Sequence, residues 1–217
     1  MNENSQSAAI KRLFFIIIVC LQPVLVFCQK GYESGYVITN DNDTLYGQIK
    51  DRKLPPFGKI YQKIRFRDKH IFQKRYDPYQ IIGYCRRGEL FESLWINVTS
   101  RFFREDYISI EGTGEKFFLK VIVKGYLTYY QREIVDPESG YFDVINLYKR
   151  ENEPEMVRVN QGIFGVNRKR LTSYFQDCPE LAYKIASRDI KDPVTMASFY
   201  NSWKASNESD SYLDANK

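Results

Sequence analysis

The sequence predicts an α+β fold: an antiparallel β-sandwich or partly closed barrel of about 8–10 strands, followed by two or three C-terminal helices. Three observations lead to this prediction. Between residues 35 and 160, apolar and polar side chains alternate with a period of two, as in half-buried strands. Turn-forming residues separate these segments at intervals of about 8–12 residues, which favours antiparallel strands over βα units. Beyond residue 166 the apolar residues recur at the spacing of helices.

The chain of 217 residues divides into four predicted segments. They are a signal peptide (1–28), an antiparallel β domain (29–165), C-terminal helices packed on the sheet (166–204) and a flexible tail (205–217). The signal peptide is indicated by Lys11-Arg12 and the apolar stretch after it, which Gln22-Pro23 interrupts. This stretch is too short and too broken for a good membrane-spanning helix, which needs about 20 apolar residues.

Cleavage after Cys28 would export the protein to the periplasm, the outer membrane or the extracellular space. Two alternatives would keep it anchored to a membrane. One is lipidation of Cys28, although Phe27 is bulkier than the residue that lipoprotein processing prefers. The other is an uncleaved N-terminal segment.

The first predicted element is a hairpin of strands 35–40 and 43–49. Asp41-Asn42 lies between them and tolerates positive φ, which fits a two-residue turn. In that register Tyr36 lies opposite Gly47 and covers it with its ring.

The remaining predicted strands follow the same alternation and are 59–67, 79–85, 89–96, 102–110, 116–123, 126–134, 141–148 and 155–160. The turn Gly112-Thr113-Gly114 is predicted to join a hairpin of 102–110 and 116–123. It is not interpreted as a phosphate-binding loop, because that motif needs a helix after it and a strand follows here.

Three helices complete the predicted fold. The first covers about residues 167–175, and the next two begin at Asp177-Cys178-Pro179-Glu180 and at Asp192-Pro193. The last helix carries an apolar stripe at positions i, i+3, i+4 and i+7, formed by Met196, Phe199, Tyr200 and Trp203. We expect this stripe to pack on the sheet.

Only Cys85 and Cys178 remain after the predicted cleavage. In an oxidising compartment two cysteines most simply form one disulfide bridge, and the alternative is two buried free thiols.

The sequence favours a protein that is not an enzyme, although it does not settle the question. The region after the signal contains a single histidine, His70, and has no HExxH, CxxC or Gly-x-Ser-x-Gly motif. We therefore predict no catalytic residues, no metal and no cofactor. The net charge of +5 is too small for a dedicated nucleic-acid binder, so no nucleic-acid partner is expected.

The strongest candidate binding residues are basic. Between residues 59 and 75 there are seven basic residues and one acid. The alternation of strand 59–67 places Lys63, Arg65 and Arg67 with Tyr61 on one face. Such a face suits an anionic glycan, a lipid headgroup or an acidic protein partner, and the alternative is a solvated outer face. The 17 tyrosines allow either stacking on sugars or core packing.

These observations predict an exported, non-catalytic protein of the cell envelope, or an interaction protein, that binds a partner through a sheet face. One alternative is a carboxylate-based hydrolase of envelope or extracellular glycans. It would hold two acids, separated as in glycosidases, at the open end of the sheet. The other is a lipid-anchored accessory protein of an assembly.

Several short motifs resemble those of uncharacterised exported proteins of Bacteroidetes bacteria. They are the hairpin residues 35–49, the strand 117–121, and the segments Cys178-Pro179-Glu180-Leu181 and Phe199-Tyr200-Asn201. The resemblance implies a bacterial, exported, β-rich protein with a helical end, and it implies no catalytic residues.

Overall fold

A computed structural model describes residues 31–52, 60–68, 73–101, 104–135, 142–160 and 165–214. The predicted signal peptide, Cys28 and His70 lie outside the described residues. The strands are β1 (Glu33–Thr39), β2 (Thr44–Arg52), β3 (Ile60–Arg67), β4 (Gln73–Tyr76), β5 (Ile81–Arg86), β6 (Glu89–Arg101), β7 (Arg104–Ile108), β8 (Glu115–Val123), β9 (Leu127–Val135), β10 (Phe142–Arg150) and β11 (Glu155–Arg158). The helices are α2 (Arg168–Tyr174), α3 (Pro179–Ala186) and α4 (Pro193–Asp214).

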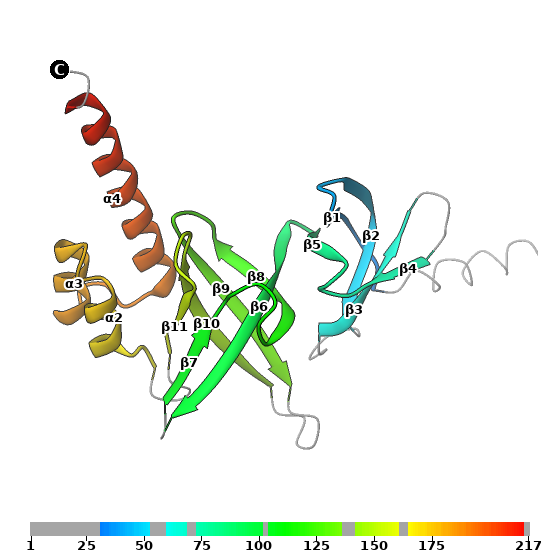
Figure 1. Cartoon of the computed structure of the whole chain (residues 1–217), viewed down its shortest axis with the longest axis horizontal. Coiled ribbons are helices and arrows are strands. Elements are labelled where there is room, and N and C mark those ends of the chain that lie inside the picture. The colour runs from blue at the N-terminus through cyan, green and yellow to red at the C-terminus, as the bar shows by residue number, and fades with distance from the viewer. Residues whose placement is uncertain are drawn as a thin grey trace, which may run out of the picture.

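Six strands close into a barrel at the centre of the molecule (Figure 1). They follow the order β6-β7-β11-β10-β9-β8, and the pairing of β8 with β6 closes the ring. Every pairing is antiparallel, so the predicted α+β fold with a barrel is confirmed. Side chains fill the interior, namely Ile96, Tyr107, Leu119, Tyr130, Ile145, Leu147 and Met156. A filled interior weighs against a hydrolase that would work inside the barrel.

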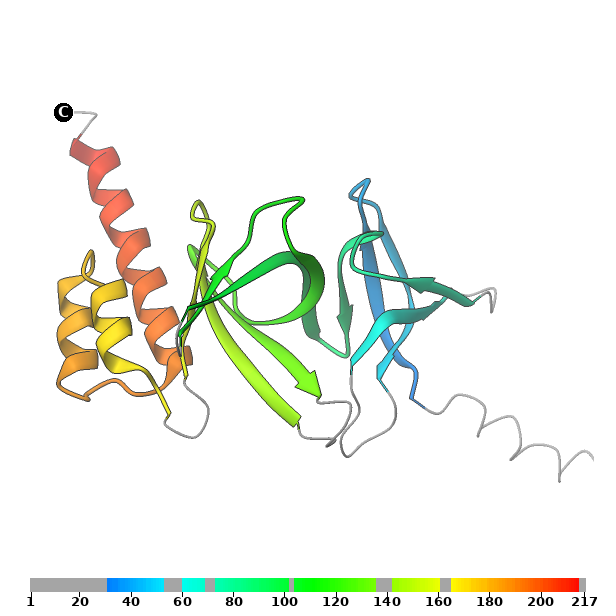
Figure 2. The same cartoon turned by 60° about the horizontal axis from the view of Figure 1, so that its bottom comes forward.

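The other five strands form an outer sheet beside the barrel, in the order β4-β3-β2-β1-β5 (Figure 2). This sheet joins the barrel where β5 pairs with the first residues of β6. It has a hydrophobic core of its own, formed by Val37, Ile49, Ile64, Phe66, Ile81, Tyr84, Phe91 and Phe118. Because Phe91 belongs to β6 and Phe118 to β8, two barrel strands contribute to both cores.

The three helices pack on the opposite end of the barrel (Figure 1). Within the predicted stripe of α4, Met196 and Tyr200 are buried, while Phe199 and Trp203 are partly buried against the same cluster. The amide of Asn201 fixes α4 to β9: its Nδ2 donates to the Leu127 carbonyl at 3.0 Å, and its Oδ1 accepts from the Leu127 N–H at 2.7 Å.

The last helix is longer than predicted, because α4 continues beyond residue 204 to Asp214. The segment from Ala205 to Asp214 contains neither glycine nor proline, so nothing in it breaks a helix.

The predicted register of the first hairpin is wrong by one residue. Tyr36 lies opposite Tyr46, and Gly35 lies opposite Gly47. The turn is longer than two residues: the Asn42 N–H donates to the Thr39 carbonyl, and the Thr39 N–H donates to the Asp43 carbonyl. Asn42 has φ 64°, so it occupies the left-handed position of a three-residue loop.

The hairpin predicted around Gly112-Thr113-Gly114 is also wrong. Within the described ranges, β7 pairs with β6 and β11, while β8 pairs with β6 and β9. The segment is a turn and a strand does follow it, but both neighbouring strands pair with the long β6 instead of with each other.

Candidate functional site

The structure places the three predicted basic residues on one face of β3. Their neighbours in the strand, Ile64 and Phe66, are buried in the core of the outer sheet. Lys63, Arg65 and Arg67 occupy the alternate positions, so they lie on the opposite face. Tyr61 is also in β3, but its side chain lies outside the described residues.

Two further cations lie beside Arg65. The register puts Lys50 of β2 opposite Arg65 on one side and Arg75 of β4 opposite it on the other. Neighbouring strands are about 4.8 Å apart, so this row of three cations spans about 10 Å across the strands. Like charges at directly opposite positions repel each other, and the row therefore concentrates positive potential on this face.

Tyr32 contacts one cation of this row, Lys50, and one cation of the next row, Arg67. The Arg67 guanidinium lies over the Tyr32 ring at 4.2 Å from its centroid, and the Lys50 Nζ lies 5.8 Å from the same centroid. The Tyr32 hydroxyl donates to Gln73 Oε1 at 2.9 Å. These contacts fix the direction of the positive side chains before any ligand binds.

Carboxylates are scarce on this face. At the described strand positions that share it, residues 44–50, 63–67 and 73–75, no acid occurs on the same side. Asp77, beyond the end of β4, forms an ion pair with Lys63 (Nζ to Oδ2, 3.3 Å). The Lys63 side chain is 59% exposed, and ion pairs of such exposed side chains contribute little to stability.

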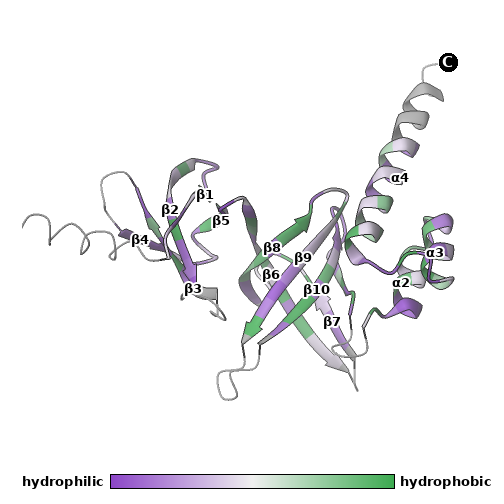
Figure 3. Cartoon of the chain, turned by 180° about the vertical axis from the view of Figure 1, so that it is seen from behind, coloured by the Kyte–Doolittle hydropathy of each residue, from purple (hydrophilic) through white to green (hydrophobic). Residues whose placement is uncertain are grey.

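An exposed aromatic ring borders the cations. Tyr46 shares its side of β2 with Lys50 and is 71% exposed. Its ring packs against that of Tyr36 at a centroid distance of 5.7 Å. We define the basic face as Tyr46, Lys50, Lys63, Arg65, Arg67 and Arg75. Figure 3 shows the hydrophilic residues of β3 and β4 in purple.

Sequence reasoning found only part of the basic face. Lys50 lies one residue beyond the predicted strand 43–49, and its place opposite Arg65 depends on a pairing between segments separated by residues 53–59. Arg75 was counted among the basic residues, whereas β4 was not predicted, because Gln73–Tyr76 shows no apolar alternation.

A buried charge cluster behind this face was not predicted at all. Asp51 is fully buried and contacts the guanidinium groups of Arg52 (3.2 Å) and Arg86 (3.4 Å). The Tyr84 hydroxyl donates to Asp51 Oδ2 at 3.1 Å, and burial raises the pKa of this phenol well above its usual value. Arg52 also pairs with Glu133 of β9 at 3.0 Å. The cluster therefore ties the outer sheet to the barrel, and its carboxylate is enclosed by its partners.

Of the two arrangements considered for Cys85 and Cys178, the structure shows no disulfide bridge, and both thiols are free. Cys85 lies in β5 of the outer sheet, whereas Cys178 is buried among the helices at the other end of the molecule. Burial raises the pKa of the Cys178 thiol, which disfavours the reactive thiolate. The alternative of two buried free thiols therefore fits Cys178, whereas Cys85 is free but only partly buried.

In the part of the chain that the structure describes, no group of three or more His, Cys, Asp and Glu side chains is arranged to hold a metal ion. Among the same residues, no helix is both long and apolar enough to cross a membrane.

Comparisons with known proteins do not extend this description. The chain matches no family model, no curated protein and no solved structure.

Proposed function

We propose that the protein is an exported, non-catalytic binding protein of the cell envelope whose basic face recognises an anionic glycan. The observation that carries the proposal is the row Lys50–Arg65–Arg75, in which three strands each place a cation at the same level. Export is the expectation from the pattern of residues 1–28.

The shape of the row favours a linear polyanion. A chain of acidic sugars carries negative charges in a line, and the cations of three neighbouring strands also lie in a line. An arginine such as Arg75 can form two parallel hydrogen bonds to a carboxylate or sulfate group.

The exposed tyrosine favours a glycan over a lipid headgroup. A pyranose ring has a C–H face that packs against an aromatic ring, and Tyr46 offers one on the same side of β2 as Lys50, about 13 Å along the strand. Attachment to a bilayer is strengthened by apolar side chains that enter it, and the alternate positions around Arg65 on this face are polar.

Binding of polygalacturonate tests the proposal, with dextran as a neutral polysaccharide and phosphatidylglycerol vesicles as a lipid surface. We expect polygalacturonate to bind, and the triple variant K50S/R65S/R75S to bind it at least tenfold more weakly. Rising salt should weaken binding, because exposed charges are screened over about 8 Å at physiological ionic strength.

The matched control variant is R168S/R188S/K191S, which removes the same charge at the helical end. It should bind polygalacturonate as the unchanged protein does. The proposal is wrong if K50S/R65S/R75S keeps the original affinity, if dextran binds equally well, or if only the vesicles bind.

A further inference from the structure

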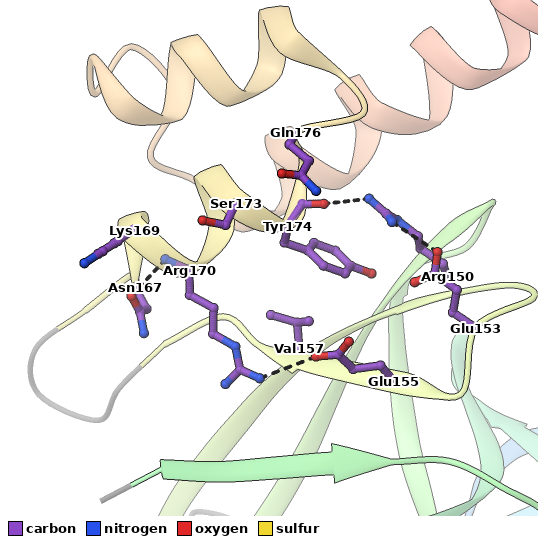
Figure 4. A pocket seen from close by; sticks show the side chains of 10 residues that line it. All are labelled: Arg150, Glu153, Glu155, Val157, Asn167, Lys169, Arg170, Ser173, Tyr174 and Gln176. Atoms are coloured by element: carbon purple, nitrogen blue, oxygen red, sulfur yellow. Dashed lines mark hydrogen bonds and ion pairs between the residues drawn. The ribbon is translucent and has the colours of Figure 1, made fainter.

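A cleft of about 600 Å³ lies at the helical end of the molecule, between α2 and the turn that joins β10 to β11 (Figure 4). It is distant from the basic face, which belongs to the outer sheet at the opposite end (Figure 1). Its volume is in the range of sites that hold small molecules.

Two pairs of guanidinium and carboxylate groups line the cleft. Arg150 donates to Glu153 Oε1 at 3.1 Å, and its other terminal nitrogen contacts Asp177 at 2.7 Å. Arg170 contacts Glu155 at 3.8 Å and Asp106 at 3.4 Å. The lining therefore presents both donors and acceptors, and each arginine has carboxylates beside it.

The cleft also has an apolar surface between these pairs. Figure 4 shows the Tyr174 ring and the Val157 side chain lying between the Arg150–Glu153 pair and the Arg170–Glu155 pair. The Arg150 guanidinium lies 4.3 Å from the centroid of the Tyr174 ring, and the Phe175 ring lies 5.0 Å from it. The Tyr174 ring is therefore held in place without a ligand.

Neutral polar side chains complete the wall. Asn167, Ser173 and Gln176 come from α2 and its two flanks. Their amide and hydroxyl groups each combine donor and acceptor capacity.

This combination excludes most ligand classes. Glu153 and Glu155, which are 44% and 55% exposed, would repel an anion. The two arginines and Lys169 would repel a cation. An apolar molecule would desolvate the charged groups without forming hydrogen bonds to them, which is unfavourable.

We infer that the cleft binds a neutral saccharide unit. A pyranose carries hydroxyl groups around its rim, each of which donates and accepts, and it has an apolar C–H face for a surface such as the Tyr174 ring. The inference is independent of the basic face and of its anionic ligand.

The experiment is a titration of the full chain, followed through its backbone amide signals in NMR spectra. The probes are glucose, galactose, mannose, N-acetylglucosamine and the disaccharides cellobiose and chitobiose, each at about 10 mM, which occupies most of a millimolar site. Acetate and glycine betaine test for an anion site and a zwitterion site. We expect at least one sugar to shift the signals of Asn167, Tyr174 and Gln176.

Ser173→Trp should fill the cleft and weaken sugar binding at least tenfold. Ser202→Trp places the same ring on an exposed position of α4 and should leave binding unchanged. Glu155→Gln keeps the shape of the side chain and should weaken binding severalfold, which tests the site without added bulk.

The inference is overturned if no sugar shifts these signals, if acetate or betaine shifts them more strongly, or if S173W and E155Q both bind as before. K50S/R65S/R75S should bind the sugar normally. Loss of polygalacturonate binding therefore bears only on the basic face, and loss of sugar binding only on the cleft.

Discussion

A single buried carboxylate, that of Asp51, joins the outer sheet to the barrel through the arginines beside it. From the sequence Asp51 is one polar residue in a polar stretch. In β2 it lies two residues after the buried Ile49, so the alternation of the strand turns both side chains toward the core. The predicted strand ended at residue 49, so the sequence did not place Asp51 in it.

Asp51→Asn should lower the free energy of unfolding by about 3 kcal/mol, because it removes the charge that compensates buried guanidinium groups. Urea unfolding followed by circular dichroism measures the change. Asp43→Asn, in the exposed first turn, is the control and should change stability by less than about 0.5 kcal/mol. Equal effects of the two substitutions would contradict a structural role for Asp51.

Tyr107 should make stability depend on pH at the alkaline end. Burial, together with a hydrogen bond to Glu105, raises the pKa of Tyr107 to about 12. In the unfolded chain a tyrosine titrates near 10, so the neutral phenol stabilises the fold fully below pH 10. This contribution is lost as the pH rises toward 12.

Urea unfolding at a series of pH values from 8 to about 11.5 measures this effect. Tyr107→Phe should show a shallower loss of stability above pH 10 than the unchanged protein, each compared with its own value at pH 8. Parallel curves would mean that Tyr107 does not contribute.

At the scale of elements, the spacing of apolar residues in the sequence predicted the positions of most strands and of all three described helices to within a few residues. It worked because burial of one face forces alternation in strands and a stripe in helices. It failed for β4, whose residues are all polar or at the sheet edge, and for the pairing of β7 and β8 with β6. Pairing between distant strands depends on the complete fold and leaves no local pattern.

The position of α4 should depend on the amide of Asn201, which occupies both backbone groups of Leu127. Asn201→Ala leaves these part-buried groups without partners and should cost about 2 kcal/mol of stability. Thermal unfolding measures the loss, with Asn207→Ala on the exposed part of α4 as the control. A melting temperature equal to that of the control would show that apolar packing alone holds α4.

At the scale of the whole molecule, the outer sheet and the barrel are built on common strands. Phe118 and Leu119 are neighbours in β8, yet the first packs in the core of the outer sheet and the second in the barrel. The fold class followed from the sequence, whereas this sharing did not, because it requires knowing which face of β8 meets which sheet. Only part of the basic face was predicted for the same reason: Lys50 and Arg75 lie beside Arg65 because of strand pairings that the sequence does not reveal.

We expect the outer sheet and the barrel to unfold together. In a Trp203→Phe variant, which leaves Trp95 of β6 as the single tryptophan of the sequence, fluorescence and the far-ultraviolet circular dichroism signal should give the same urea midpoint. Phe118→Ala and Leu119→Ala should both move that single midpoint downward. Two separate transitions, each sensitive to one of the substitutions, would show that the sheets are independent.

The thirteen residues of β6 have a consequence for anyone who wants to divide this protein. No cut between residues 89 and 101 leaves the core of the outer sheet complete, because that core also contains Phe118 of β8. Fragments meant to isolate the outer sheet must retain β6 and β8, and by then they contain most of the barrel.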